Sequence, residues 1–157
     1  MELSVIIVNY NSLQLLEQCL QSVQKAIKNF SSEIIIIDNN SSDSSREVLP
    51  KLLPGTKIII NQQNIGFAKA CNQGLKQASG KFILFLNPDT IIPENCFEKC
   101  IYFFEAHEDA GATGVRMTDG EGKFLKESKR GFPSSGSSFN KLFGLAFLFP
   151  RSKIFAK

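Results

Sequence analysis

The sequence predicts an α/β fold in which a mostly parallel sheet is flanked by helices. Four short apolar runs, rich in β-branched residues, have the length and composition of buried strands. Segments of helical length separate these runs, and strands that alternate with helices usually pair in parallel. Three of the runs end abruptly in polar residues, where the loops of such sheets bind ligands.

The first half of the expected fold contains two strands and two helices. Leu3–Asn9 is the first strand, and Ser12 can cap a helix that carries apolar residues at three- and four-residue spacing as far as Ile27. Glu33–Asp38 is the second strand. Residues 41–43 supply caps for a helix that continues toward the Pro-Gly pair at 54 and 55.

Two more strands follow this break. We expect a strand at Thr56–Ile60, a helix at Ile65–Ala78 that Gly80 closes, and a strand at Lys81–Leu86. Two glycines inside the expected helix, Gly66 and Gly74, are costly there and predict a close approach to a strand or a ligand.

The last part of the chain is less regular. Pro93 begins a helix that runs to about His107, and Ala110–Met117 is a predicted strand. The turn at 119–122 is expected to close a hairpin with Phe124–Lys126. Phe139–Phe155 fits a helix or an irregular segment whose apolar side needs a cover.

Composition excludes several classes of protein. The chain has 157 residues and a net charge of +3, which is too mild to indicate nucleic-acid binding. No apolar run is long enough for a membrane span, and we do not expect a secretory signal before the first strand, because the start of the sequence shows no basic region and no cleavage site. The four cysteines, Cys19, Cys71, Cys96 and Cys100, form no metal-binding pattern and are expected to be reduced and structural, with Cys96 and Cys100 as two buried thiols.

Charge divides the chain into a body, residues 1–130, and a tail, residues 131–157. After Glu127 come six basic residues and no acidic one, and six of the 14 phenylalanines lie in the same stretch. A basic, Phe-rich segment of this kind is expected to pack on further chain, on a partner or on a membrane surface.

The polar segments that follow the first, second and fourth strands are the candidate site. They begin at Asn9, Asp38 and Asn87, and parallel strands bring their carboxyl ends to one edge of the sheet. No glycine-rich phosphate loop is present, so a bound diphosphate would need a divalent cation, for which Asp89 is placed. A simple turn with Asp89 as an Asx-turn residue is the alternative.

Several candidate residues also have a purely structural interpretation. Asp38 can accept hydrogen bonds from a base or ribose, or act as a turn residue, and Tyr10 can stack on a nucleobase or only close its strand. Asp43 is expected to cap the following helix. Lys69 can reach a base or a phosphate, or be solvated.

The motifs VNYNS (8–12), IIDNNSSDSS (36–45), NIGFAKACNQG (64–74) and LNPDT (86–90), in this order, resemble family 2 glycosyltransferases of the GT-A (Rossmann-like) fold. The form of the last two is most similar to the rhamnosyltransferase-like branch, which builds bacterial surface polysaccharides. The resemblance covers about residues 3–130 and implies that the chain is the donor-binding part of such an enzyme, incomplete at its carboxyl end.

The resemblance also implies roles for individual residues. Tyr10 would lie against the nucleobase with Asn9 beside it, and Asp38 would bind the base. The segment that flanks the nucleotide would contain Asn64, Lys69 and Asn72. Asp89 matches the last acid of a DxD motif that binds Mn²⁺ or Mg²⁺, while Asn87 stands in place of the first acid.

The reaction implied is inverting transfer from a UDP- or dTDP-sugar to a hydroxyl of a saccharide or lipid-linked acceptor. The resemblance implies that the catalytic base lies in a later acidic segment, so the base is unassigned and expected beyond Lys157. Asp119 and Glu121 look like turn residues and are given no catalytic role. The expected location is the cytoplasm, with a peripheral contact to the inner face of the membrane left open. A homo-oligomer or a separate second half that supplies the base, and a non-catalytic module that binds a membrane or partner, are the alternatives.

Overall fold

The computed structural model describes residues 1–52 and 56–125. The proposed tail at 131–157, the segment Phe139–Phe155 and the end of the expected hairpin at Lys126 lie outside the described residues. Contacts divide the chain into two units, Met1–Asp109 and the residues from Ala110 onward. The boundary expected at residue 130 stays a prediction.

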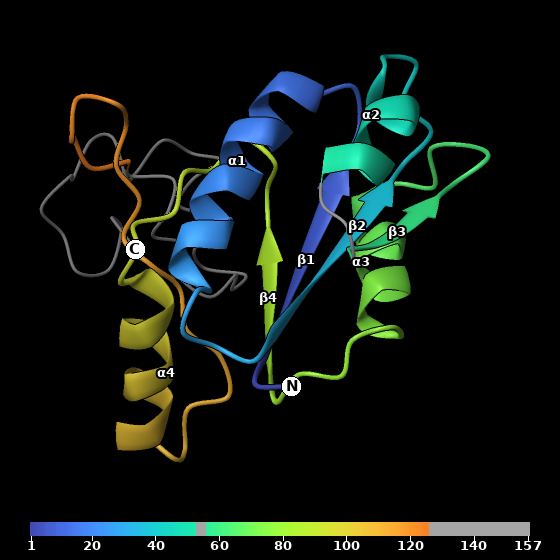
Figure 1. The fold of residues 1–157 in the computed structure, drawn as a ribbon. Helices are drawn as coiled ribbons and strands as arrows, with labels where there is room; N and C mark the ends of the chain where they lie inside the picture. Colours follow the sequence, from blue (N-terminus) through green and yellow to red (C-terminus); the bar gives the residue numbers. More distant parts are fainter. Residues whose placement is uncertain (53–55, 126–157) are drawn as a thin grey trace, which may run out of the picture. The chain divides into compact units, whose positions relative to one another are not determined.

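The first unit is built on a four-stranded parallel sheet, as predicted. Its strands are β1 (Leu3–Asn9), β2 (Ser32–Asp38), β3 (Lys57–Ile60) and β4 (Phe82–Leu86). Their order in the sheet is β3-β2-β1-β4 (Figure 1). The register pairs Asn9 with Asp38 and Ile7 with Leu86, so the carboxyl ends of β1, β2 and β4 lie at one edge.

Helices cover both faces of this sheet (Figure 1). They are α1 (Leu13–Ala26), α2 (Ser45–Leu52), α3 (Phe67–Leu75) and α4 (Cys96–Ala106). Val5 and Ile7 of β1 pack in a core with side chains of α1, α2 and α4, whereas Ile6 and Val8 pack with α3. Alternate residues of one strand therefore enter two cores, which explains the uninterrupted apolar run.

Close packing explains the glycine at position 74, one of the two glycines expected to be costly in a helix. A Cβ atom at this position would lie 2.5 Å from Cγ2 of Ile6 and 2.8 Å from Cδ1 of Ile37, so α3 lies directly against the sheet. Gly66 has another reason: it precedes α3 with φ at +84°, a conformation that glycine adopts without steric cost.

Replacing Gly74 by alanine is expected to destabilise the chain by about 1–2 kcal/mol, because overpacking against Ile6 and Ile37 exceeds the helix propensity gained. Urea denaturation measures this free energy of unfolding. Gly114→Ala is the control, since nothing lies within 4 Å of its added Cβ. Equal stability of the two variants would contradict the close packing of α3.

A hydrogen-bonded cluster around Glu33 ties the opposite, amino-terminal edge of the sheet together. Oε1 of Glu33 accepts hydrogen bonds from the hydroxyls of Ser4 at 2.9 Å and Ser79 at 2.6 Å, and from the Ser79 amide at 2.7 Å. Nζ of Lys57 lies 2.8 Å from Oε2. Burial alone raises the pKa of Glu33, but these bonds outweigh it and lower the pKa to about 2.

The start of α1 differs from the expectation. Ser12 does precede the helix, but its hydroxyl donates to the carbonyl of Tyr10 instead of accepting from the helix. The amide of Leu13 instead donates to Oδ2 of Asp43, at 3.2 Å. Asp43 also accepts from the amide of Ser45 at the start of α2, so one carboxylate caps two helices.

Two predictions for the later part of the chain were wrong in their details. The predicted strand at Ala110–Met117 is not formed; in the described residues only Thr118 and Phe124 form an antiparallel bridge. Glycines at 111 and 114 weaken a strand here, and no partner strand pairs with it among the described residues. The last helix of the first unit begins at Cys96, after a turn at Pro93.

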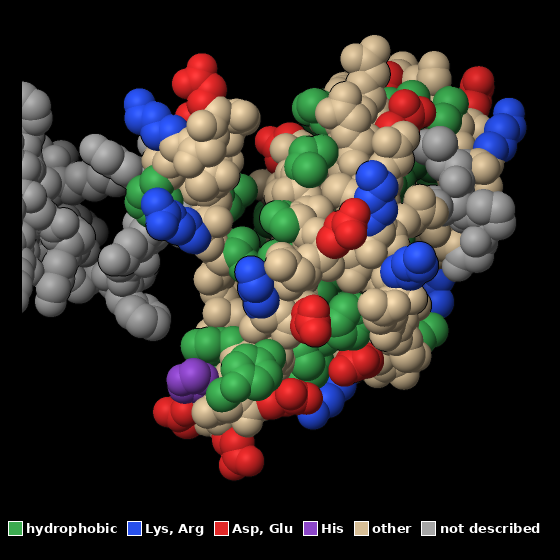
Figure 2. Space-filling model, turned by 60° about the vertical axis from the view of Figure 1, so that its left-hand side comes forward, with side chains coloured by type: hydrophobic (Ala, Val, Ile, Leu, Met, Phe, Trp, Pro, Cys, Tyr) green, Lys and Arg blue, Asp and Glu red, His purple; other side chains and the backbone are tan. Residues whose placement is uncertain are grey.

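The side chains of α4 include exposed aromatic groups. Tyr102 is 70% exposed, and Figure 2 shows apolar side chains among charged ones on the face that carries α4. The four cysteines are free, with Cys19 and Cys71 buried but Cys96 and Cys100 only partly buried. Within residues 1–52 and 56–125, no helix has the length and apolarity required to cross a bilayer.

Candidate functional site

The candidate site lies where the strand order changes direction. From β1 the chain moves through β2 to β3 on one side, and β4 then pairs with the other side of β1. In open parallel sheets, the loops at such a switch point diverge and leave a crevice for a ligand. The segments that begin at Tyr10 and Asn87 leave the sheet at this point.

A buried polar pair joins the ends of β1 and β2. The side-chain amide of Asn9 donates to Oδ1 of Asp38 at 2.9 Å and contacts the hydroxyls of Ser41 and Ser45. Both Asn9 and Asp38 are fully buried. Oδ1 of Asn9 has no hydrogen-bond partner among the described residues.

Arg46 of α2 lies over this pair. Its Nε is 3.7 Å from Oδ2 of Asp38, which also accepts from the amide of Ser41. The guanidinium donates to the side-chain oxygen of Asn40 and to the carbonyl of Asn61. Protein groups therefore engage both oxygens of Asp38, and its role toward a base stays a prediction.

A second network, made of amides, holds the loop before α3. Asn39 is 2% exposed; its Nδ2 donates to Asn64 at 2.7 Å, and its Oδ1 accepts from Asn61 and from the amide of Ile65. Asn61 and Gln73 exchange two hydrogen bonds through their side chains. The carboxyl end of β2, the loop and α3 are therefore joined by one set of side chains.

Replacing Asn39 by alanine is expected to lower the free energy of unfolding by about 2 kcal/mol, because a buried amide that serves three partners is lost. Chemical denaturation measures this loss. Gln62→Ala is the control, since Gln62 is exposed in the same loop and should change stability by less than about 0.5 kcal/mol. Equal losses in the two variants would contradict a structural role for Asn39.

The other predicted site residues are exposed around the same edge. Tyr10, at the end of β1, is 49% exposed. Lys69 and Asn72 are exposed on α3, and the side chain of Asn64 also accepts from the amide of Gly66. The sequence analysis did not identify Arg46 or the amides Asn39, Asn61 and Gln73 as site residues. Nothing in a single sequence distinguishes a polar side chain that joins such a network from one that is solvated.

Asp89 has the chemistry of a ligand for a hard cation. Its side chain is exposed and accepts no hydrogen bond from the described residues, and Asn87 is also exposed. Anywhere within residues 1–52 and 56–125, no group of three His, Cys, Asp or Glu side chains is placed to hold a metal ion. This donor set fits Mg²⁺ or Mn²⁺ that takes its other ligands from phosphate oxygens and water, and does not form a cage by itself.

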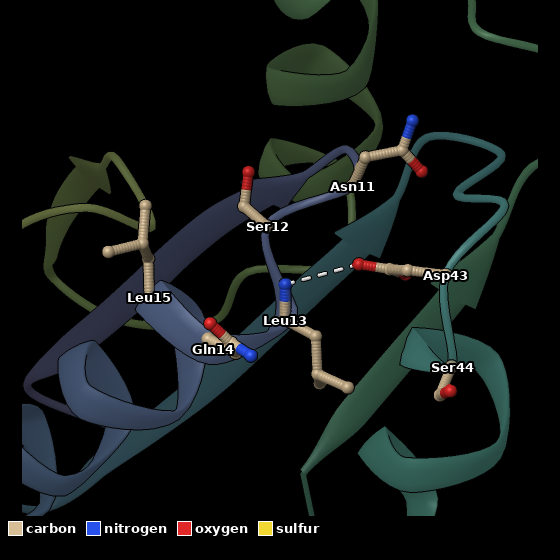
Figure 3. A pocket seen from close by; sticks show the side chains of 7 residues that line it. All are labelled: Asn11, Ser12, Leu13, Gln14, Leu15, Asp43 and Ser44. Carbon is tan, nitrogen blue, oxygen red and sulfur yellow. Dashed lines mark hydrogen bonds between the residues drawn. The ribbon is translucent and has the colours of Figure 1, made fainter.

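A cavity of about 380 Å³ lies beside the start of α1 (Figure 3). Its walls come from the β1–α1 loop, the first turn of α1 and the loop before α2. The carboxylate of Asp43 already satisfies the amide of Leu13 here, and its pKa is lowered because bonds from Ser45 and Leu13 outweigh the effect of burial. A negative charge at this helix terminus disfavours a second anion.

A family model described as "Glycosyl transferase family 2" matches residues 4–155, nearly the whole chain. This chain belongs to glycosyltransferase family 2. The four-stranded parallel sheet with helices on both faces is the corresponding GT-A arrangement, and it confirms the predicted fold class.

The names of two curated relatives refer to the synthesis of polymers. The minor teichoic acid biosynthesis protein GgaB of Bacillus subtilis is 31% identical over 112 residues, which cover 69% of this chain and 12% of GgaB. The poly-beta-1,6-N-acetyl-D-glucosamine synthase of Staphylococcus aureus strain COL is 36% identical over 105 residues, 66% of this chain and 25% of the synthase. The predicted rhamnosyltransferase-like branch stays a prediction.

Solved structures share the fold of this chain. TarS 1–349 of Staphylococcus aureus in complex with UDP is 27% identical and superposes with a TM-score of 0.66, over 87% of this chain and 39% of TarS 1–349. This family 2 chain therefore spans well under half the length of the relatives that it matches.

Proposed function

We propose that the chain binds the donor of a glycosyl transfer, a UDP- or dTDP-sugar, at the carboxyl edge of β1 and β4. The observation that carries the proposal is the switch point between these strands, beside which Asp89 is exposed and accepts no hydrogen bond from residues 1–52 and 56–125. UDP bound to the related TarS supports a uridine nucleotide as the donor.

The chemistry proposed is inverting transfer to an acceptor hydroxyl. That hydroxyl attacks the anomeric carbon as the nucleoside diphosphate leaves, through a transition state with oxocarbenium character. Asp89, with Asn87 beside it, would hold Mn²⁺ or Mg²⁺, which supplies positive charge to offset the diphosphate. Tyr10 would stack on the base, and Lys69, Asn64 and Asn72 would flank the nucleotide.

No described acid is proposed as the catalytic base. Asp119 accepts from the amides of Glu121 and Lys123, as a turn residue does. The acceptor proposed is a saccharide or lipid-linked hydroxyl in surface polysaccharide synthesis, consistent with the names of the relatives. The location proposed is the cytoplasm, at or near the inner face of the membrane.

Isothermal titration of the 157-residue chain with UDP-GlcNAc tests donor binding, first with Mn²⁺ and then with EDTA. We expect saturable one-site binding that is tighter with Mn²⁺, and a dTDP-sugar titration compares the two bases. Absence of binding for both donors with Mn²⁺ present would overturn the proposal.

A further inference from the structure

The segment between β4 and α4 carries Asp89 but has few backbone contacts. Among the described residues, the backbone of residues 88–92 forms only a turn at 88 and 89 and makes no hydrogen bond to the backbone of a helix or strand. Asp89 therefore sits on a segment that regular secondary structure does not position, and other groups must fix its conformation.

Two side chains of α1 make hydrogen bonds to this segment. The thiol of Cys19 lies 3.7 Å from the carbonyl of Asn87 and donates to it. The hydroxyl of Ser22 accepts from the amide of Ile92 at 3.0 Å and donates to the carbonyl of Cys19 at 2.7 Å. Cys19 and Ser22 lie three residues apart, so both face the segment from one side of α1.

The bond between Ser22 and Ile92 is buried, and the bond between Cys19 and Asn87 is partly buried. Cys19 is fully buried, Ser22 is 9% exposed and Ile92 is 8% exposed.

We propose that Cys19 and Ser22 are positioning residues that hold the Asp89 segment in the geometry needed to bind a cation with the diphosphate of the donor. The proposal rests on the proposed function. The two side chains do not touch the nucleotide or the cation; they act through the carbonyl of Asn87 and the amide of Ile92, on either side of Asp89. Partners behind metal ligands commonly set metal affinity by about 10–100-fold.

The test compares UDP affinity with Mn²⁺ and with EDTA in the 157-residue chain. Their ratio, the Mn²⁺ enhancement, reports the Asp89 segment and is insensitive to a general loss of stability. Cys19→Ala and Ser22→Ala are each expected to lower this ratio about 10-fold while UDP affinity in EDTA stays unchanged. Cys19→Ser replaces the thiol donor by a hydroxyl donor, Ser22→Thr retains the hydroxyl, and both are expected to restore most of the ratio.

Val23→Ala is the matched control, because it removes buried atoms from α1 without a hydrogen bond to the segment. It should lower stability and leave the ratio unchanged. If Ser22→Ala does not fold, the Mn²⁺ enhancement of Cys19→Ala is compared with that of Cys19→Ser, and a lower enhancement in Cys19→Ala supports the positioning role.

The outcomes separate this inference from the proposed function. A wild-type ratio in both alanine variants would overturn the positioning role and leave donor binding intact. UDP binding that is equal with Mn²⁺ and EDTA in the wild type would also overturn it. No UDP binding by the wild type in either condition would overturn the proposed function, and the inference with it.

Discussion

Replacing Asp89 by asparagine is expected to remove the Mn²⁺ enhancement of UDP binding, a loss of about 100-fold in affinity when Mn²⁺ is present. The carboxylate is exposed and has no hydrogen bond to the described residues, so its loss does not disturb the fold. Asparagine at 89 would leave two neutral amides, with Asn87, where a cation needs negative oxygen. Titration calorimetry with Mn²⁺ and with EDTA measures both affinities.

Glu94→Gln is the matched control for Asp89→Asn. Glu94 is another exposed acid between β4 and α4, and its neutralisation changes the net charge by the same amount. We expect it to bind UDP as the wild type does in both conditions. A wild-type Mn²⁺ enhancement in Asp89→Asn would remove Asp89 from the site.

Replacing Glu33 by glutamine is expected to lower the free energy of unfolding by about 3 kcal/mol at neutral pH. Glutamine keeps the shape of the side chain but loses the charge that Lys57, Ser4 and Ser79 stabilise at the amino-terminal edge of the sheet. Because the pKa of Glu33 in the folded chain, about 2, lies below its ordinary value of 4.5, ionisation stabilises the folded state above that ordinary value.

This contribution is lost as the pH falls from about 4.5 toward 2, where the folded carboxylate also takes up a proton. Urea denaturation of the wild type should therefore show falling stability over this range, and Glu33→Gln should show a flatter profile. Lys57→Met removes a half-exposed ammonium that pairs with Glu33 and donates to the carbonyl of Gln77, and it should cost about 1 kcal/mol or less. Parallel profiles for the wild type and Glu33→Gln would contradict the lowered pKa.

Local pattern was sufficient for the elements of the first unit. The apolar run Leu3–Asn9 is buried on both faces, which only a strand between two helical layers permits. Its pattern differs from that of Ala110–Met117, where the prediction of a strand was wrong. A strand requires a partner for its backbone, and the sequence of one segment does not reveal whether such a partner exists.

The positions of the candidate site residues could be predicted from the sequence, but their surroundings could not. Polar residues after apolar runs indicated Tyr10, Asp38 and Asp89, since parallel strands end at one edge of a sheet. The sequence did not separate their environments: Asp38 is fully buried with both oxygens engaged, whereas Asp89 is exposed. Burial depends on side chains brought from elsewhere in the chain, in this case Asn9 and Arg46.

By itself, the sequence determined the succession of strands and helices in the first unit and the family, because both depend on residues that are close together in the chain. The tertiary structure alone decided that Asp43 caps α1 as well as α2, and that the amides that follow β2 and β3 form one network with an amide of α3. It also decided that α1 holds the Asp89 segment. These contacts join residues far apart in sequence, and their geometry exists only once the sheet has set the distances between its loops.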